Sequence, residues 1–172
     1  MAEDRRTILK VLTSVLGTGA AAAIAGPALQ AVLSPLGKVT VSGSGGWVPV
    51  CNLEAVPEDG GPVNVQVVVA EPKDAWTKMP PTTVGAVFLM KKAGKVVAYS
   101  TVCPHLGCGI DYQPAAGQFA CPCHESSFDA EGRVAAGPSP RGMDELETEI
   151  KDGAVHVRFM KFKIGSAEKV PA

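Results

Sequence analysis

Two short stretches, C-P-H-L-G-C-G at residues 103–109 and C-P-C-H-E-S-S-F at residues 121–128, hold four of the five cysteines and two of the three histidines. Each stretch offers one thiol and one imidazole at C-x-H or C-x-x-H spacing, and 15 residues lie between His105 and Cys121. Side chains this close in sequence reach one metal centre only where the chain turns tightly, and the prolines and glycines favour such turns. The spacing therefore predicts a metal centre with the ligands Cys103, His105, Cys121 and His124.

Two kinds of metal centre use two cysteines and two histidines. The set could hold one tetrahedral Zn²⁺, or a 2Fe–2S cluster with both thiolates on one iron and both imidazoles on the other. Cys108 and Cys123 lie in the same two stretches, where a disulfide could clasp the loops and would persist in an exported protein. Because a zinc ribbon has no need of such a clasp, the extra cysteines favour the cluster.

The composition is that of one turn-rich domain with a short appendage. The 172 residues carry a formal net charge of −1, which provides neither the basic field that nucleic-acid binding needs nor an acidic solvating tail. With 19 Gly and 14 Pro, a β architecture is favoured over a helical bundle.

The N-terminal segment has the character of a membrane anchor. Residues 11–37 contain no charged side chain, and as a helix they would reach roughly 40 Å, more than the ~30 Å hydrocarbon core. Arg5, Arg6 and Lys10 precede this run and Lys38 follows it, so the positive-inside rule places the N-terminus in the cytoplasm. We expect residues 1–37 to form one transmembrane helix in a bacterial inner membrane, with the rest of the chain on the periplasmic side.

The same segment also has features of an export signal. The paired arginines before an apolar run resemble a twin-arginine signal, whose export route carries proteins already folded around a cofactor. Ala-x-Ala sites at residues 20–25 leave cleavage by a signal peptidase as the alternative to a retained anchor. Residues 38–46 end in Ser-Gly-Ser-Gly-Gly, the composition of a flexible hinge.

Residues 47–172 show the patterns of one antiparallel β domain. Short apolar runs predict strands at residues 63–69, 86–90 and 96–100, with a hairpin between the last two. Asp152-Gly153 separates two alternating runs, which predicts a second hairpin.

Three further expectations concern residues outside the two cysteine stretches. In the second hairpin His156 alternates with Val155 and Val157, so we expect it to face solvent and give it no ligand role. We expect Cys51 to be a buried unpaired thiol. Residues 165–172 are expected to form a loosely held tail.

The two stretches resemble, nearly residue for residue, the cluster boxes of the Rieske iron–sulfur proteins, and the chain looks like the anchored members over essentially its whole length. The resemblance implies a mainly β fold: an antiparallel Rieske-type domain with a cluster-binding subdomain at about residues 101–141, behind one N-terminal transmembrane helix. It implies a 2Fe–2S cluster with Cys103 and Cys121 on the buried iron and His105 and His124 on the outer iron. It also implies a disulfide between Cys108 and Cys123.

The resemblance carries further residues over. Leu106 would shield the cluster and line a quinol-docking surface, the Ser126 hydroxyl would donate to a bridging sulfide, and Pro138 belongs to Gly137-Pro138-Ser139-Pro140, which is similar to the family's proline loop. Two positions depart from the family pattern. Glu125 stands where Gly is usual, and Phe128 stands where high-potential members have a Tyr that donates to a ligand sulfur. A missing donor predicts a less oxidising cluster, suited to menaquinol.

Within the family, the disulfide, anchor and hinge are typical of subunits of quinol-oxidising cytochrome bc complexes. The resemblance thus implies an electron-transfer subunit of a membrane quinol–cytochrome c oxidoreductase, in contact with lipid, with His105 and His124 meeting quinol. Its implied partners are a cytochrome b-type subunit and a c-type cytochrome. The alternatives are the Rieske small subunit of a periplasmic arsenite oxidase, which would accept electrons from a molybdenum subunit, and a zinc-stabilised binding module.

Overall fold

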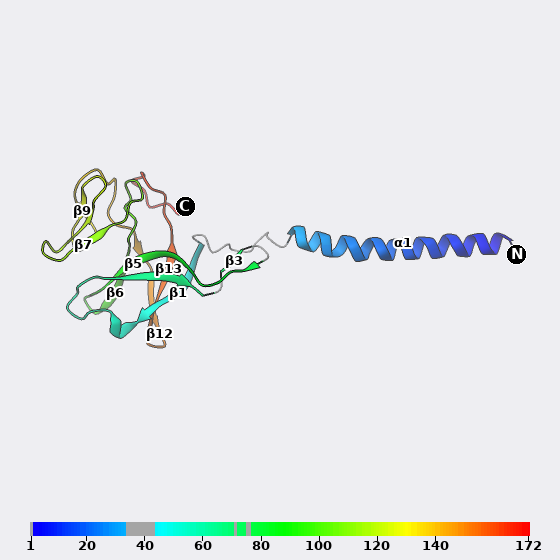
Figure 1. The fold of residues 1–172 in the computed structure, drawn as a ribbon, viewed down its shortest axis with the longest axis horizontal. Helices are drawn as coiled ribbons and strands as arrows, with labels where there is room; N and C mark the ends of the chain where they lie inside the picture. Colours follow the sequence, from blue (N-terminus) through cyan, green and yellow to red (C-terminus); the bar gives the residue numbers. More distant parts are fainter. Residues whose placement is uncertain (1, 34–43, 71, 75–76) are drawn as a thin grey trace. The chain divides into compact units, whose positions relative to one another are not determined.

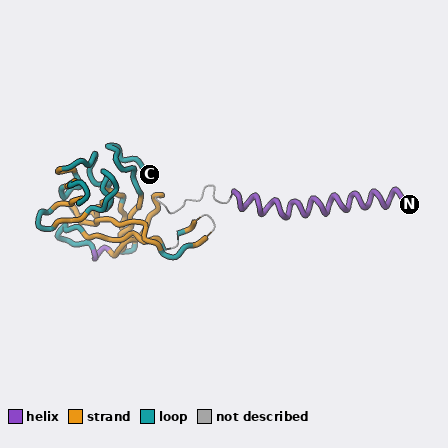
Figure 2. The backbone as a smooth tube through the Cα atoms, turned by 45° about the horizontal axis from the view of Figure 1, so that its top comes forward, coloured by secondary structure: helices purple, strands orange, loops and turns teal. Residues whose placement is uncertain are grey.

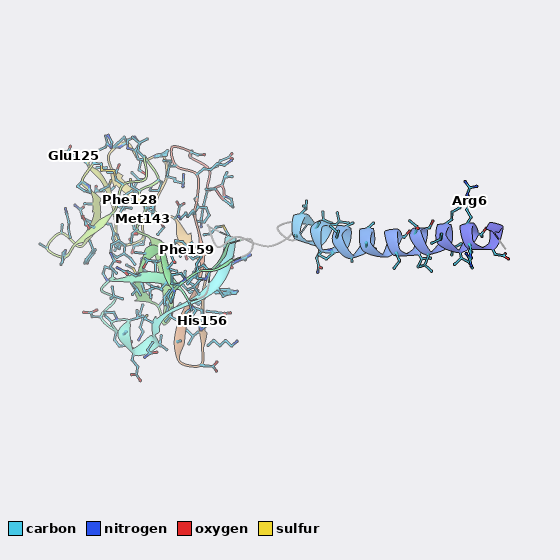
Figure 3. The ribbon with its side chains drawn as sticks, turned by 45° about the vertical axis from the view of Figure 1, so that its right-hand side comes forward. Arg6, Glu125, Phe128, Met143, His156 and Phe159 are labelled. Carbon is cyan, nitrogen blue, oxygen red and sulfur yellow. A yellow bond between two sulfur atoms is a disulfide. The ribbon has the colours of Figure 1, made fainter. Side chains whose placement is uncertain are left out.

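The structure, a computed structural model, describes residues 2–33, 44–70, 72–74 and 77–172. These residues form an N-terminal helix and a β-rich head (Figure 1). Helix α1 runs from Ala2 to Leu33 and continues through Pro27, with Arg6 near its start (Figure 3). It is long and apolar enough to cross a membrane. The expected N-terminal helix is therefore confirmed, and residues 34–37 of the expected anchor lie outside the described residues.

The described part of the head contains three larger antiparallel sheets and a small two-stranded sheet. The first has the order β1-β13-β12, formed by Ser44–Asn52, Ala154–Met160 and Thr148–Lys151. The second has the order β11-β6-β5-β2, formed by Glu145–Leu146, Lys95–Ser100, Thr82–Lys92 and Val63–Val69. The third has the order β10-β9-β8-β7, formed by Val134–Ala136, Ser126–Phe128, Gln118–Cys121 and Asp111–Gln113. The remaining short elements are η1 (Leu53–Ala55), β3 (Lys73–Asp74) and β4 (Thr77–Lys78).

Strand β5 joins two hydrophobic cores because it is buried on both faces. Successive side chains of a strand point to opposite faces. Val87 and Leu89 therefore enter the core shared with β13, while Phe88 and Met90 enter a second core with Phe119 and Phe128 of the third sheet. The second core also contains Cys103 and Cys121. The alternating side-chain directions along β5 thus place the third sheet, and the cysteines with it, against the second sheet.

The predicted strands and hairpins are confirmed. Residues 63–69 are β2, and the 86–90 and 96–100 runs lie in β5 and β6, which pair antiparallel. The β12–β13 turn places Asp152 at φ 52° and Gly153 at φ 75°, the two left-handed residues of the hairpin turn that this dipeptide favours. His156 is half-buried in β13, and Figure 3 shows it far from Glu125, which lies at the opposite end of the head.

The expectation of a loosely held C-terminal tail is wrong. The Lys163 N–H donates to the Val170 carbonyl at 2.9 Å, and the Ala172 N–H donates to the Lys161 carbonyl at 2.9 Å. The Lys169 ammonium lies 4.7 Å from the centre of the Phe162 ring. The segment is ordered because its polar backbone groups find partners within it and on the head.

The expected hinge overlaps β1. Residues 44–46 belong to this strand, and Ser44 pairs with Met160 of β13. Residues 38–43 lie outside the described residues. Residues 44–46 of the expected hinge are therefore part of the first sheet.

Candidate metal centre

Two loops carry the predicted ligands, at the end of the head where loops and turns gather (Figure 2). The first loop connects β6 to β7 and is closed by its own backbone. The Cys103 N–H donates to the Cys108 carbonyl at 2.8 Å, and the Gly107 N–H donates to the Cys103 carbonyl at 2.9 Å. Gly107 has φ 83°, a left-handed conformation that glycine adopts without steric cost. The glycine predicted to make a tight turn here does so.

The second loop is the short connection between β8 and β9. Cys121 and Ser126 face each other across these two strands, so only residues 122–125 form the turn. Glu125 closes it with φ 57°. A left-handed backbone is costly for a residue with a Cβ atom, so Glu125 is strained where glycine, the residue that the resemblance implies here, would not be.

A disulfide joins the two loops. Cys108 and Cys123, the pair that the resemblance implies, are bonded with their Cα atoms 6.5 Å apart. The Cys121 sulfur lies within 4.8 Å of both disulfide sulfurs. Because disulfide sulfurs are not free thiolates, these three cysteines are not themselves a ligand set. Their proximity shows instead that the disulfide holds the first loop against Cys121.

The other two cysteines are buried and face each other. Cys103 is 0% exposed and Cys121 is 2% exposed, and their thiol groups are within hydrogen-bonding contact. Burial raises the pKa of the Cys103 thiol and the Cys121 thiol raises it further, although backbone N–H groups of His105 and Leu106 donate to its sulfur and act in the opposite direction. Two adjacent buried thiols with amide donors aimed at one of them are well suited to carry the negative charge of metal thiolates.

The two predicted histidines also come together. The rings of His105 and His124 lie edge to face, with their centres 4.8 Å apart and their planes at 86°. His124 is exposed and His105 is half-buried. The Nδ1 atom of His105 is buried, yet it has no hydrogen-bond partner among the described residues. An unpartnered buried nitrogen is costly, and coordination of a metal would satisfy it.

Ser126 supplies a second unsatisfied polar atom. Its side chain is 1% exposed, and its hydroxyl has no partner among the described residues. A single zinc ion bound by the four predicted ligands would leave this hydroxyl without an acceptor, whereas a sulfide of a 2Fe–2S cluster could accept a hydrogen bond from it. The donor set of two thiols, two imidazoles and one hydroxyl therefore fits the cluster better than zinc.

The proline loop packs on the second ligand loop. Gly137 has φ 91°, and a Cβ atom on it would lie 2.5 Å from Ser126 Cα and 2.7 Å from the Glu125 carbonyl oxygen. Pro138, which follows, is exposed. Leu106 is 56% exposed beside His105. An apolar side chain thus lies on the surface next to the histidine pair.

The sequence analysis missed the part that the C-terminal segment plays. The Gly165 N–H donates to the carbonyl of Pro104, between Cys103 and His105, at 2.8 Å. The Arg141 guanidinium, directly after the proline loop, donates hydrogen bonds to the carbonyls of Lys163 and Ser166 in the C-terminal segment. The sequence offers one signal for this arrangement: Arg141 is followed three residues later by Asp144, which gives a pair of opposite charges within a loop. Cys51, in β1, is half-buried and in no disulfide among the described residues, and burial raises the pKa of its thiol.

Both ligand loops lie within a region of the chain that matches a known protein family. The family model described as the Rieske [2Fe-2S] domain matches residues 46–150, more than half of the chain. A solved structure of a hyperthermophilic respiratory Complex III is similar over 82% of this chain and 98% of that chain, with 21% identity and a TM-score of 0.51. At that identity, the likeness concerns the fold alone.

Two curated relatives share part of the sequence. The cytochrome b6-f complex iron-sulfur subunit of Chlorobaculum tepidum is 34% identical over 71 residues, which cover 41% of this chain and 39% of that protein. The chloroplastic cytochrome b6-f complex iron-sulfur subunit of Oryza sativa subsp. japonica is 37% identical over 71 residues, covering 40% of this chain and 32% of that protein. The match spans less than half of the length of either relative.

Proposed function

Because the chain belongs to the Rieske [2Fe-2S] domain family, we propose that it is the electron-transfer subunit of a membrane quinol–cytochrome c oxidoreductase. Its similarity to two cytochrome b6-f complex iron-sulfur subunits supports this role. So does a helix long and apolar enough to span a membrane. Its partners would be a cytochrome b-type subunit and a c-type cytochrome, with lipid around α1.

The proposed ligands divide by chemistry and by burial. Cys103 and Cys121 would hold the inner iron through two buried thiolates, and His105 and His124 would hold the outer iron through imidazole nitrogens. When bound, the 2Fe–2S cluster accepts and releases one electron, at a higher potential than an all-cysteine cluster because imidazole replaces thiolate charge. The observation that carries the assignment is the buried, unpartnered Nδ1 of His105 beside the second imidazole.

The exposed side of the centre is suited to quinol. If Nδ1 of each histidine binds iron, Nε2 remains to accept a hydrogen bond from a quinol hydroxyl and to hold its proton. His124 is exposed, so its ring is accessible. Leu106 would contact the apolar part of the quinol and exclude water from that hydrogen bond. Electron uptake and proton uptake would thereby be coupled at one side chain.

The charges of the N-terminal segment support an orientation in the membrane. Arg5, Arg6 and Lys10 precede the uncharged run, so the N-terminus would be cytoplasmic and the head would lie on the periplasmic side. A head tethered ahead of Ser44 could then carry the electron from quinol to a haem by moving as a body. Prolines placed between residues 38 and 43 should slow turnover.

Spectroscopy of ligand variants tests the proposed centre. The dithionite-reduced full chain should give an electron paramagnetic resonance spectrum with a low average g value, which zinc cannot give. Cys103→Ser and His124→Ala should lose this spectrum. Their matched controls, Cys51→Ser and His156→Ala, should keep it. A Cys103 variant with an intact signal would overturn the ligand assignment.

A periplasmic arsenite oxidase small subunit is the second candidate, and the buried Phe128 favours it. Phe128 is 0% exposed and brings no hydroxyl to the centre, which suits a cluster of lower potential. Purification in gentle detergent separates the two functions. A cytochrome b-type subunit and quinol-dependent reduction support the quinol complex, whereas a molybdenum subunit and arsenite-dependent reduction support the oxidase.

A further inference from the structure

Arg141 is a buried cation whose guanidinium group donates four hydrogen bonds. Its side chain is 9% exposed and that of Asp144 is 6% exposed. Nε donates to one carboxylate oxygen of Asp144 at 2.9 Å and Nη2 to the other at 2.8 Å. This two-pronged pairing fixes the plane of the guanidinium. The Asp144 carbonyl in turn accepts from the Ser100 N–H at 2.8 Å, which anchors the pair to the end of β6.

The free edges of this guanidinium hold the C-terminal segment, residues 161–172. Nη2 donates to the Lys163 carbonyl at 3.0 Å, and Nη1 donates to the Ser166 carbonyl. These two carbonyls flank Gly165, whose N–H donates to the Pro104 carbonyl at 2.8 Å. Arg141 therefore fixes the backbone on both sides of the amide that binds the first ligand loop.

The Pro104 carbonyl belongs to the same peptide group as the His105 N–H. That N–H donates to the Cys103 sulfur. A hydrogen bond to a peptide oxygen polarises the peptide and strengthens its N–H as a donor, so hydrogen bonds in series reinforce one another. The Gly165 N–H thus acts on the Cys103 sulfur through one peptide group.

Apolar packing beneath the segment is incomplete, so its position depends on these polar contacts. A cavity of about 540 Å³ separates part of it from the sheets, lined among others by Val102, Phe159, Phe162 and Ile164. Ile164 is 48% exposed. Its Cδ1 atom would lie 3.6 Å from a Cβ atom on Gly107, so it also lies against the first ligand loop. The C-terminal segment thus forms one wall of the cavity and contacts the first ligand loop through Ile164.

We propose that the C-terminal segment, held by Arg141, is a positioning element that raises the reduction potential of the cluster by strengthening the His105 N–H to Cys103 sulfur hydrogen bond. Hydrogen bonds to cluster sulfurs stabilise the reduced, more negative state. The inference rests on the proposed role of Cys103 as a ligand. Arg141 and Gly165 contact no reacting atom, and both act through Pro104.

The test compares midpoint potentials of the cluster-loaded full chain in detergent. Arg141→Met/Asp144→Leu removes the anchor without changing net charge, which avoids both a direct Coulomb effect and an unpaired buried carboxylate. Gly165→Pro removes the donor N–H without a charge change and, because Gly165 has φ 69° whereas proline holds φ near −65°, also displaces this part of the segment. Gly165→Ala, which strains the same backbone position but keeps the N–H, is its control and should shift the potential less. Arg158→Met/Glu147→Leu is the control for the change of residue types, since it removes an exposed ion pair, at 3.1 Å, between Arg158 of β13 and Glu147.

We expect a negative shift of the potential in both test variants and none in the control. The combined variant should shift no further than Gly165→Pro alone, because both changes act through one donor. Hydrogen exchange at the His105 amide should also become faster in both test variants. An unchanged potential in Gly165→Pro, or full additivity in the combined variant, overturns the proposal.

Two further outcomes are also decisive. If Arg141→Met/Asp144→Leu loses the cluster, Gly165→Pro alone decides the question. If Cys103→Ser retains the spectrum, the ligand assignment fails independently of the segment. If Cys103→Ser loses the spectrum but the potential is unchanged in Gly165→Pro, the ligand assignment stands and only the proposed role of the C-terminal segment is refuted.

Discussion

The backbone of Ser126 leaves no room for a side chain on Gly137. A Cβ atom at residue 137 would lie 2.5 Å from Ser126 Cα and 2.8 Å from Ser126 N. All the close atoms belong to backbone, which cannot rotate away. Gly137 thereby sets how closely the proline loop covers the second ligand loop.

Gly137→Ala should therefore destabilise the head and displace the proline loop. We expect a loss of ~2–5 kcal/mol, from ~1–2 for a left-handed alanine and ~1–3 for overpacking. Gly153→Ala is the control, since Gly153 is also left-handed, with φ 75° against 91° for Gly137, but no atom lies within 4 Å of its built Cβ. It should lose only the ~1–2 kcal/mol of the left-handed alanine. Denaturant unfolding of both variants, with the cluster spectrum recorded alongside, measures the difference. Equal losses would contradict the steric explanation.

Glu125→Gly should stabilise the protein. Glu125 has φ 57°, which costs a residue with a side chain about 1 kcal/mol or more relative to glycine. Glu125→Gln separates backbone strain from charge, because it removes the carboxylate and keeps the strain. We expect a gain of ~1 kcal/mol in the free energy of unfolding for Gly and none for Gln. A gain shared by both variants would show that charge, not φ, is the cause.

Local patterns in the sequence sufficed for the strands and the ligand pairs. The apolar run in β5, the Asp152-Gly153 turn and the C-x-H and C-x-x-H spacings all act over a few residues, so a sequence window contains the whole signal. The two-sided burial of β5 is already visible in its uninterrupted apolar run, A-V-F-L-M at residues 86–90.

The C-terminal segment could not be foreseen in the same way. Gly165 contacts Pro104, and Arg141 contacts Lys163 and Ser166, across tens of residues and with backbone carbonyls as partners. Any residue has a carbonyl, so no side-chain pattern announces such a contact. Glu125 is the converse case. The sequence shows that Glu125 replaces the glycine of the family pattern. It does not show that the backbone is left-handed at this residue, which is the reason that the replacement costs stability.

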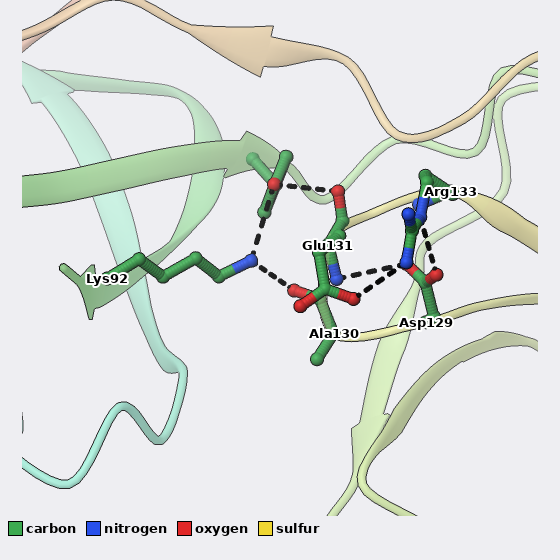
Figure 4. Close-up of polar contacts among 6 residues, drawn as sticks. Lys92, Asp129, Ala130, Glu131 and Arg133 are labelled. Carbon is green, nitrogen blue, oxygen red and sulfur yellow. Dashed lines mark hydrogen bonds and ion pairs between the residues drawn. The ribbon is translucent and has the colours of Figure 1, made fainter.

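Asp129 should make stability depend on pH in the acid range. Burial raises the pKa of its carboxyl, but backbone and side-chain hydrogen bonds from Arg133, its charge, and the Glu131 N–H outweigh burial and leave the pKa below its usual value (Figure 4). The carboxylate accepts both N–H groups at 2.9 Å and the Arg133 Nε at 2.8 Å. A depressed folded pKa contributes stability above the unfolded value of about 3.9, and this is lost as pH falls through the folded pKa.

Asp129→Asn tests this dependence. The difference in unfolding free energy between wild type and variant should be constant from about pH 7 to 5 and should shrink below about pH 4. Asp59→Asn is the comparison, because Asp59 also accepts a backbone N–H in a turn, from Gly61 at 2.8 Å, but no ion pair to it is found within the described residues. A difference that stays constant down to pH 2 would contradict the prediction.

Phe128→Tyr should raise the midpoint potential. Phe128 is fully buried in the core that contains Cys103 and Cys121, so an added hydroxyl has no access to water. It must find an acceptor or cost ~1–3 kcal/mol as an unsatisfied group. A ligand sulfur in that core is a suitable acceptor, and a donor to it stabilises the reduced state. Phe119→Tyr is the control, since that equally buried ring is surrounded by the rings of Phe88, Tyr99 and Tyr112. We expect a higher potential with stability retained in Phe128→Tyr, and no such rise in Phe119→Tyr.

A Phe128→Tyr protein of unchanged potential would show that the missing hydroxyl does not set the potential of this cluster. The inference that the chain serves a low-potential donor such as menaquinol would then lose its support.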